Sequence, residues 1–229
     1  MLASEIIDEA REFHISFDEE MHPTTMLLRA VHRAEARFVD VVANIAPDAL
    51  AVDLIYDEAD IAAGILGGAL TIPAYRALLP TGVLANPQGL FPVSIVSDEQ
   101  SQGGSELNVR VVGRALYIAQ PTAFQAEMPS AVSASLQNYT YFVNATALRL
   151  TYIPAPSPLT SLSGVLTSPD DSRRFLQAEL VKFMALRDPG VAAERPGLMA
   201  EASMLQEDVI ENYARRSGGE TRWYVSTVG

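Results

Sequence analysis

Three histidines are the side chains of this sequence best suited to metal binding or proton transfer. His14, His22 and His32 are eight and ten residues apart, whereas a zinc site on one helix needs two histidines four residues apart, as in HExxH. The spacing therefore favours separate, partly exposed helix and loop histidines. The chain has no cysteine, which excludes a thiolate metal site, a cysteine nucleophile and a disulfide scaffold.

A second group of motifs is typical of nucleotide binding. The tetrapeptide DEAD at residues 57–60 spells a helicase motif, but no phosphate-binding GxxxxGK[ST] loop occurs in the sequence. Gly64, Gly67 and Gly68 do not form GxGxxG, and we interpret them as residues that relieve crowding in a loop. The sequence also lacks a GxSxG nucleophile elbow. Neither nucleotide hydrolysis nor a serine triad is therefore expected.

Carboxylates are abundant enough to supply an acid–base pair of the kind that glycosidases use. The densest groups are residues 18–20 and 57–60, and we interpret both as charge at helix starts and in loops. The sequence thus predicts no catalytic residue, no cofactor site and no metal site. We expect a protein that is not an enzyme.

The charge balance limits the partners of the chain. Its formal net charge is -12, from 16 basic and 28 acidic side chains. Binding to duplex DNA through phosphates requires clustered lysine and arginine, and no cluster stands out in the sequence. Sequence-specific DNA binding is therefore not expected, although an acidic wall would let DNA slide past it.

Neither a leader nor a membrane segment is expected. The start, MLASEIIDEAREF, lacks the basic segment and apolar core of a signal peptide. The most apolar run, residues 61–73, is too short to span a bilayer and contains three glycines and a proline. We expect a soluble protein that is made inside the cell and does not contact a membrane.

Helical periodicity marks both ends of the chain. Apolar residues recur at spacings of three and four over residues 6–13 and again over residues 27–45, where they predict a long amphipathic helix. Two further helices are predicted at residues 168–188 and 198–216. The first opens with a proline and two aspartates, and a pair of glycines ends the second.

The middle of the chain, residues 48–168, has short apolar runs separated by Gly, Pro, Asn and Ser, which predicts β structure. Gly113 interrupts one of these runs and predicts a bulge or a bend. The polar segment 97–106 is expected to be a hairpin or loop. The best strand predictions are residues 50–56, 91–97, 107–119 and 145–153.

Three prolines follow the last predicted strand, at positions 154, 156 and 158. Proline lacks an amide donor and fixes φ, so these residues end strand pairing and hold the chain extended as a stiff spacer. The sequence therefore predicts an α+β fold. Its expected parts are a helical bundle of residues 1–50 and 169–217, an inserted β-rich domain of residues 51–168, and an extended C-terminal arm of residues 218–229.

The C-terminal segment follows a Gly-Gly pair and contains the only tryptophan. Trp223, Tyr224, Val225 and Val228 are apolar or aromatic at a terminus that would normally be polar. One interpretation is a last strand that folds back on its own domain. The favoured interpretation is an arm that contacts a neighbour or partner by β-augmentation or aromatic anchoring.

Three stretches together resemble the head-to-tail connector (adaptor, or head-completion) proteins of tailed bacteriophages. They are residues 4–50, the strand with its prolines at residues 148–171, and the helix pair that follows. In such proteins a helical bundle made from both chain ends is interrupted by a β-rich unit, and the C-terminal segment reaches toward the portal. The resemblance is one of layout and covers most of the chain.

The resemblance implies a homo-oligomeric ring, commonly of twelve copies, that lies between the portal and a downstream neck or tail protein of the virion. Double-stranded DNA would pass through its centre without specific binding. Twelve copies with a charge of -12 each carry about -144, which suits a channel that does not hold phosphates. A ring also needs two different contact surfaces on each copy.

The resemblance also implies roles for named residues. The segment from Trp223 to Val228 would dock on the portal or on a neighbouring copy. The loop at residues 97–106 would face the channel or the next tail component. Its candidate contact residues are Asp98, Glu99, Gln100, Gly103 and Gly104.

We therefore expect a structural protein of the phage neck, and two alternatives remain open. One is another neck or tail component, such as a tail terminator or tail-completion protein. The other is a carbohydrate-active virion enzyme. A ring of several hundred kilodaltons would favour the connector, whereas a monomer or dimer with paired carboxylates in one cleft would favour the enzyme.

Overall fold

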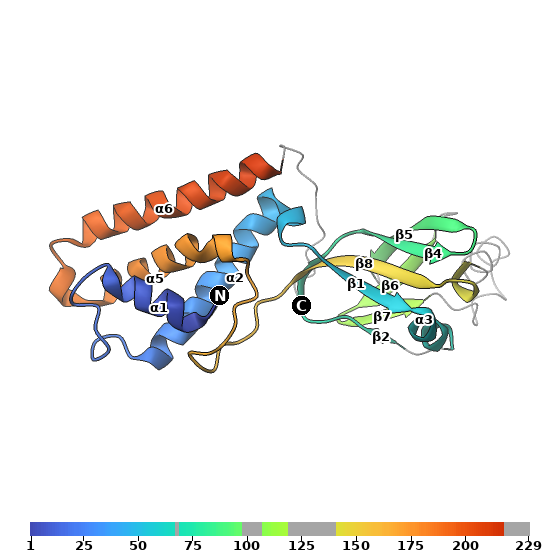
Figure 1. Ribbon diagram of the computed structural model, residues 1–229, viewed down its shortest axis with the longest axis horizontal. Helices are drawn as coiled ribbons and strands as arrows, with labels where there is room; N and C mark the ends of the chain where they lie inside the picture. Colours follow the sequence, from blue (N-terminus) through green and yellow to red (C-terminus); the bar gives the residue numbers. More distant parts are fainter. Residues whose placement is uncertain (67–68, 98–106, 119–140, 218–229) are drawn as a thin grey trace. The chain divides into compact units, whose positions relative to one another are not determined.

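The structure is a computed structural model that describes residues 1–66, 69–97, 107–118 and 141–217 (Figure 1). It contains helices and an eight-stranded sheet, which confirms the predicted α+β class. The described residues fall into two compact units. We call residues 1–50 and 155–217 the helical unit, and the described residues of 51–154 the β unit.

The helical unit has a core shared by helices from distant parts of the sequence. Helix α5 contacts α1, α2 and α6, and α2 contacts α6 as well. The ring of Phe38 on α2 meets Phe175 of α5 and Tyr213 of α6 edge-on, at centroid distances of 5.4 and 5.5 Å. These helices are α1 (Ala3–Glu12), α2 (Thr24–Ile45), α5 (Arg173–Arg187) and α6 (Arg195–Arg216).

The helix bounds follow the sequence pattern with small shifts at the ends. The helix predicted over residues 27–45 is confirmed by α2. Residues Asp170–Ser172 form a 3-10 turn, so α5 begins later than predicted, at Arg173. Helix α6 begins three residues before the predicted residue 198, because a proline is compatible with the first turn of a helix.

The β unit consists of one mixed sheet. Its strand order is β1-β8-β4-β5-β6-β7-β2, and β3 also pairs with β8. The pairs are antiparallel except for β5 with β6, which run parallel. The strands are β1 (Val52–Asp57), β2 (Leu70–Thr71), β3 (Tyr75–Leu78), β4 (Thr81–Asn86), β5 (Gly89–Ser97), β6 (Asn108–Val112), β7 (Ala115–Ile118) and β8 (Ala147–Pro154).

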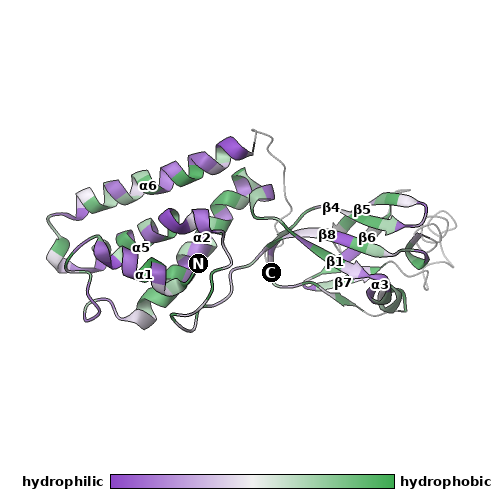
Figure 2. Ribbon diagram, in the orientation of Figure 1, coloured by the Kyte–Doolittle hydropathy of each residue, from purple (hydrophilic) through white to green (hydrophobic). Residues whose placement is uncertain are grey.

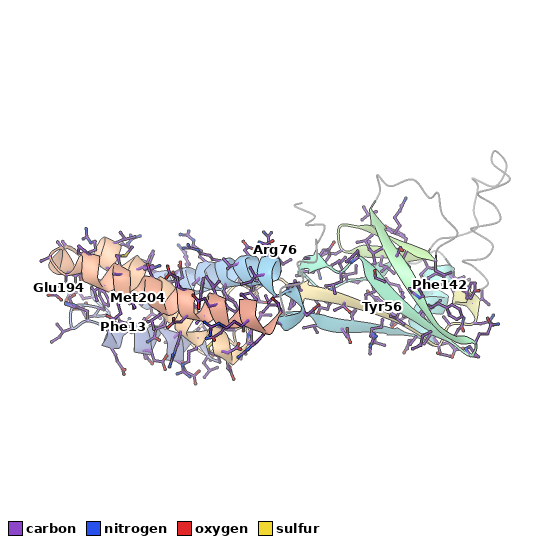
Figure 3. All side chains as sticks on the ribbon, turned by 90° about the horizontal axis from the view of Figure 1, so that it is seen from above. Phe13, Tyr56, Arg76, Phe142, Glu194 and Met204 are labelled. Carbon is purple, nitrogen blue, oxygen red and sulfur yellow. The ribbon has the colours of Figure 1, made fainter. Side chains whose placement is uncertain are left out.

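The sheet curls around its own apolar core. Helix α3 (Glu58–Ile65) follows β1 and contacts strands from both ends of the strand order, β1 and β2, together with β7 and β8. The hydroxyl of Tyr56 on β1 donates to the carbonyl of Thr71 on β2 at 3.0 Å. Burial raises the pKa of Tyr56 to about 12. Figure 3 shows Tyr56 and Phe142, both buried, among these strands.

Helix α3 corrects the expectation that Gly64 lies in a loop. Gly64 is helical, and a Cβ atom there would lie 2.9 Å from Cδ1 of Ile118 on β7. Glycine therefore lets α3 approach the sheet closely. The acidic tetrapeptide is helix-start charge, as interpreted, because Asp57 caps α3 by accepting from the amide of Asp60 at 3.0 Å. Gly67 and Gly68 lie outside the described residues.

The predicted strands are confirmed, but the sheet has more strands than predicted. Within the predicted run, β6 and β7 form a hairpin over residues 108–118, and Gly113 lies in its turn with φ at 59°, so the predicted bend is a hairpin turn. Strands β2, β3 and β4 were not predicted. Their apolar runs are short, and β2 has only two residues.

The boundary between the β unit and the helical unit lies in the proline segment, after Pro154, and not at residue 168 as predicted. Strand β8 ends at Pro154 as predicted, but residues 155–168 belong to the helical unit. The reason is hydrogen bonding: the amide of Ala3 donates to the carbonyl of Gly164 at 3.0 Å, and the amides of Thr167 and Ser168 donate to a buried carboxylate of α2. The segment is therefore fastened to α1 and α2 over its second half.

Candidate functional site

The interface residues predicted from the sequence lie outside the described part of the chain. The structure therefore does not place them, and their roles remain predictions. They are Asp98, Glu99, Gln100, Gly103 and Gly104 of the loop, and Trp223, Tyr224, Val225 and Val228 of the C-terminal arm.

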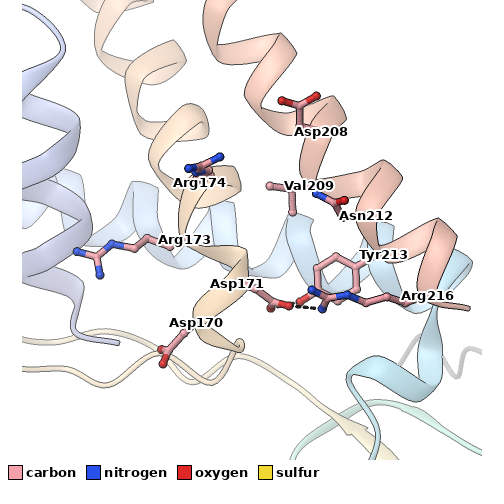
Figure 4. Close-up of a pocket in the computed structure, with 9 residues that line it drawn as sticks. All are labelled: Asp170, Asp171, Arg173, Arg174, Asp208, Val209, Asn212, Tyr213 and Arg216. Carbon is pink, nitrogen blue, oxygen red and sulfur yellow. Dashed lines mark hydrogen bonds and ion pairs between the residues drawn. The ribbon is translucent and has the colours of Figure 1, made fainter.

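A pocket of about 330 Å³ lies where α5 begins and α6 ends (Figure 4). Its position is notable because α6 ends at Arg216, two residues before the predicted arm. The pocket is therefore the described site nearest to that arm in sequence. Its lining residues are Asp170, Asp171, Arg173, Arg174, Asp208, Val209, Asn212, Tyr213 and Arg216.

One carboxylate, Asp171, joins the two helices in this pocket. The hydroxyl of Tyr213 donates to one oxygen of Asp171, and the guanidinium of Arg216 donates to the other. The guanidinium carbon of Arg216 also lies 5.5 Å from the centre of the Tyr213 ring. Burial, together with the bond to Asp171, raises the pKa of Tyr213, so its hydroxyl stays a hydrogen-bond donor. This network fixes the last turns of α6 against the start of α5.

Arg173 and Arg174, the two arginines at the start of α5, differ in their ion pairs. Arg173 points away from Asp171 toward α1 (Figure 4), where its Nε donates to the carboxylate of Glu9 at 2.8 Å. That bond raises the pKa of Arg173. Arg174 is exposed and makes no ion pair within the described residues. The pocket is therefore built mainly as a junction between helices, with both oxygens of its central carboxylate occupied.

A second polar cluster lies between the α1–α2 connection and the α5–α6 connection. Ser16 donates its hydroxyl hydrogen to Asp188 at 2.6 Å, and Asp188 also accepts from the amide of Gly190 at 2.7 Å. These bonds, the Ser16 hydroxyl first, lower the pKa of Asp188. His14 lies 2.7 Å from the Ser16 hydroxyl and 2.9 Å from the carboxylate of Glu194.

The cluster contains serine, histidine and carboxylate side chains, which are the residue types of a nucleophilic triad. In a triad the histidine accepts the proton of the serine hydroxyl. Here the single hydroxyl hydrogen of Ser16 is directed to Asp188, and His14 also accepts from the backbone amide of Ser16 at 3.2 Å. The geometry suits hydrogen bonds that join the two connections, and it does not activate Ser16 as a nucleophile.

His22 corrects the expectation of partly exposed histidines. Its side chain is completely buried, edge-on to Phe17, with Nε2 3.9 Å from a carboxylate oxygen of Asp188. Neither ring nitrogen has a hydrogen-bond partner among the described residues. Burial lowers the pKa of His22, so the neutral ring is favoured in the folded state. His14 fits the expectation, with 17% of its side chain exposed.

The structure reveals a group of basic side chains that sequence analysis missed. Arg29, Arg33 and Arg37 lie at intervals of four along the exposed face of α2. Arg37 donates to both oxygens of Glu179 on α5, at 2.8 and 3.0 Å. Arg29 and Arg33 make no ion pair within the described part of the chain. Their regular spacing inside a predicted helix was the signal that could have found them.

Across the described residues, no three or more His, Asp or Glu side chains are grouped so that they could hold a metal ion. None of the helices described is both long enough and apolar enough to cross a bilayer.

Two comparisons of the chain, with protein-family profiles and with curated protein sequences, give no relative. No protein-family profile matches it, and no curated protein matches its sequence. The function proposed below therefore depends on the layout of the sequence and on the geometry of the two units.

Proposed function

We propose that this chain is a head-to-tail connector (adaptor) of a tailed bacteriophage. It is a structural virion protein that forms a homo-oligomeric ring of about twelve copies between the portal and a downstream neck or tail protein. Double-stranded DNA passes through an acidic channel without specific binding. In this proposal the helices from both chain ends form one bundle, the β unit is an inserted domain, and residues 218–229 are an arm that contacts the portal or a neighbouring copy.

The observation that carries the proposal is the contact of α5 with both α1 and α2. Helices from the first 45 residues thus pack with a helix that starts at residue 173. The β unit, whose residues come between these helices in the sequence, has an apolar core of its own, which includes Leu84, Leu148 and Leu150. The resemblance of the sequence to connector proteins leads us to expect this layout, and the contacts of α5 with α1 and α2 support the proposal.

The net charge of the chain supports the proposal that a ring of copies encloses an acidic channel for DNA. A net charge of -12 per copy gives a ring a strongly negative potential, which repels phosphates and keeps passing DNA mobile. Within the described residues, several arginines form ion pairs with carboxylates of the chain itself. Examples are Arg173 with Glu9 and Arg37 with Glu179.

The pocket at the end of α6 supports the proposed docking role of residues 218–229. Tyr213 and Arg216 hold the last turns of α6 to Asp171, and the predicted arm begins two residues later. A segment that docks on a partner binds more tightly when its base is fixed, because less conformational entropy is lost on binding.

Electron microscopy and mass measurement of the full-length chain, alone and mixed with portal particles, test the proposal. We expect rings on the portal, with a mass of about 300 kDa for twelve copies of 24.7 kDa. A variant that lacks residues 219–229 is expected to keep its helical circular dichroism and to bind the portal at least about 10-fold more weakly.

The other outcomes are equally informative. A chain that stays a 24.7 kDa monomer and never binds portal particles contradicts the proposal. Rings that bind tail tubes but not the portal would replace the connector with a tail terminator. Portal binding unchanged by the deletion would exclude the arm as the docking segment.

A further inference from the structure

We propose that the exposed arginines Arg29 and Arg33 of α2 bind the acidic outer face of α6 in a neighbouring copy of the chain. The inference rests on the proposed function, because a ring requires two different complementary surfaces on each copy. It names those two surfaces, which the sequence resemblance does not do.

The first surface is the exposed face of α2. Its buried residues, among them Leu27, Val31 and Phe38, lie on the face that packs into the helical unit. Arg29 and Arg33 are exposed and point to the opposite side by their helical spacing. Neither makes an ion pair within the described residues. Guanidinium groups are weakly hydrated and match carboxylates in a bidentate geometry, so they favour ion pairs at protein interfaces.

The second surface is the outer face of α6. Buried residues such as Ala202, Val209 and Tyr213 occupy one side of this helix, and hydrophilic residues recur along its length (Figure 2). Met204 is 66% exposed (Figure 3). The four exposed carboxylates near it are Glu201, Glu207, Asp208 and Glu211.

These carboxylates are poorly neutralised by their own chain. In the part of the chain that the structure describes, only Glu211 of the four makes an ion pair, with Arg215 at 2.8 Å. Glu207 also interacts electrostatically with the ammonium group of Lys182 on α5. An exposed apolar side chain surrounded by carboxylates suits a contact in which a partner supplies the positive charge.

The two surfaces fit each other in charge and in spacing. Arg29 and Arg33 are four residues apart, and so are Glu207 and Glu211, so two helices lying side by side can pair them in register. The ion pair of Glu211 with Arg215 uses only Oε2 of this carboxylate, and Oε1 can accept from the arginine of the neighbour. No ion pair joins the two faces within one chain, as far as its described residues show. The contact is therefore available between copies, and its two sides are different surfaces, as closure of a ring requires.

DNA is a less suitable occupant of the arginine face. Two unpaired arginines neutralise few phosphates, and the chain around them has a net charge of -12. Duplex binding through the backbone requires several phosphate contacts. We therefore assign the arginines to the neighbouring copy and make DNA binding an outcome of the test.

Charge reversal on each surface and then on both tests the contact. Arg29→Glu with Arg33→Glu, or Glu207→Lys with Glu211→Lys, is expected to weaken self-association at least about 10-fold in analytical ultracentrifugation, because attractions become repulsions. The chain with all four substitutions is expected to regain association within about 3-fold of the wild type, since the charges are exchanged. A one-to-one mixture of the two reversed variants should also regain it.

Controls separate this inference from the proposed function. Arg187→Glu reverses another exposed arginine, on α5, and should leave association unchanged, and circular dichroism should show every variant folded. If the wild type forms rings and neither reversal weakens them, the inference is overturned while the proposed function stands. If the wild type forms no rings, the proposed function fails first. If only the arginine reversal has an effect, and that effect is loss of DNA retention, the arginines face DNA and the inference is wrong.

Discussion

The helical unit and the β unit differ in the contacts that stabilise each of them internally. Of the seven buried polar residues in the described chain, six lie in the helical unit and only Asn86 lies in the β unit. The helical unit is fastened by side-chain bonds between distant segments, such as Glu35 with Ser168, and Ser16 with Asp188. The β unit relies on its strand ladders and an apolar core.

The difference follows from how each unit is assembled. Residues 51–154 are continuous, so strand register follows from hydrogen-bonded neighbours and from the alternation of apolar side chains. The helical unit brings together residues 1–50 and 155–217. Apolar stripes alone permit several alignments of such separate segments, whereas a buried polar pair is satisfied in only one. The polar bonds therefore specify the alignment.

The largest effect is expected from Glu35. Its buried carboxylate accepts from the amides of Thr167 and Ser168 at 2.6 and 2.8 Å. Glu35→Ala leaves these donors without a partner and should lower the free energy of unfolding of the helical unit by about 3 kcal/mol. Glu35→Gln keeps an acceptor and should cost about 1 kcal/mol. Urea titration, with hydrogen exchange as the readout for the helical unit, measures the loss of unfolding free energy in both variants. An equal loss in the two variants would contradict the role of Glu35 as a hydrogen-bond acceptor.

The corresponding change in the β unit is Gly82→Ala on β4. A Cβ atom there would lie 2.6 Å from Cδ2 of Leu150 and 2.8 Å from the carbonyl oxygen of Arg149. The backbone atom cannot move aside easily, so the substitution should cost about 2 kcal/mol and affect the β unit alone. Gly197→Ala is the matched control, because nothing lies within 4 Å of its Cβ position. It should be neutral or stabilise α6 slightly, and calorimetry distinguishes the two variants.

A smaller effect is expected from the pH dependence of the helical unit. Burial lowers the pKa of His22, so the unfolded state binds a proton more readily. Stability should therefore fall as the pH drops below about 6.5, the ordinary pKa of histidine, by at most about 1.4 kcal/mol per pH unit. It should stop falling once the pH passes the folded-state pKa. His22→Leu should remove this part of the dependence, and an unchanged profile in thermal melts would be inconsistent with the neutral buried ring.

The smallest effect is expected at the surface of the helical unit. Arg37 is 62% exposed and pairs with Glu179, and exposed ion pairs contribute about 0.2–1 kcal/mol. Arg37→Ala should therefore lower the free energy of unfolding by less than about 1 kcal/mol, and added salt should reduce the difference. A loss near that of Glu35→Ala in the same urea titration would mean that surface charge, and not buried polar bonds, aligns the segments.

The sequence predicts those parts of the fold that have a period. The stripe of α2 and the alternation in β8 were long enough to identify both elements. Gly113 correctly marked the turn between β6 and β7, and Pro154 correctly marked the end of β8. Helix α3 and strand β2 were missed because a short segment takes its conformation from what it packs against. Gly64 lies where α3 comes close to Ile118, a contact that no local pattern records.

The site was harder to predict than the fold. The bond between Glu35 and Ser168 spans 133 residues, and nothing near Glu35 in the sequence distinguishes it from the other carboxylates of the chain. His22 was expected to be partly exposed, and this expectation was wrong. Its burial depends on Phe17 and on Asp188 of a distant loop, and the sequence near His22 does not show that contact. Arg29 and Arg33 were predictable, since their spacing alone places them on one face of a helix.

The connector proposal depends most directly on helices from both chain ends forming one cooperative bundle. Native-state hydrogen exchange on the full-length chain measures this, with Glu35→Ala as the perturbation. The account predicts that the most protected amides of α1, α2, α5 and α6 share one opening free energy. Glu35→Ala should lower that energy in all four helices and leave β1, β4 and β8 unchanged. Separate opening of the helices of residues 1–50 and those of residues 155–217 would contradict it.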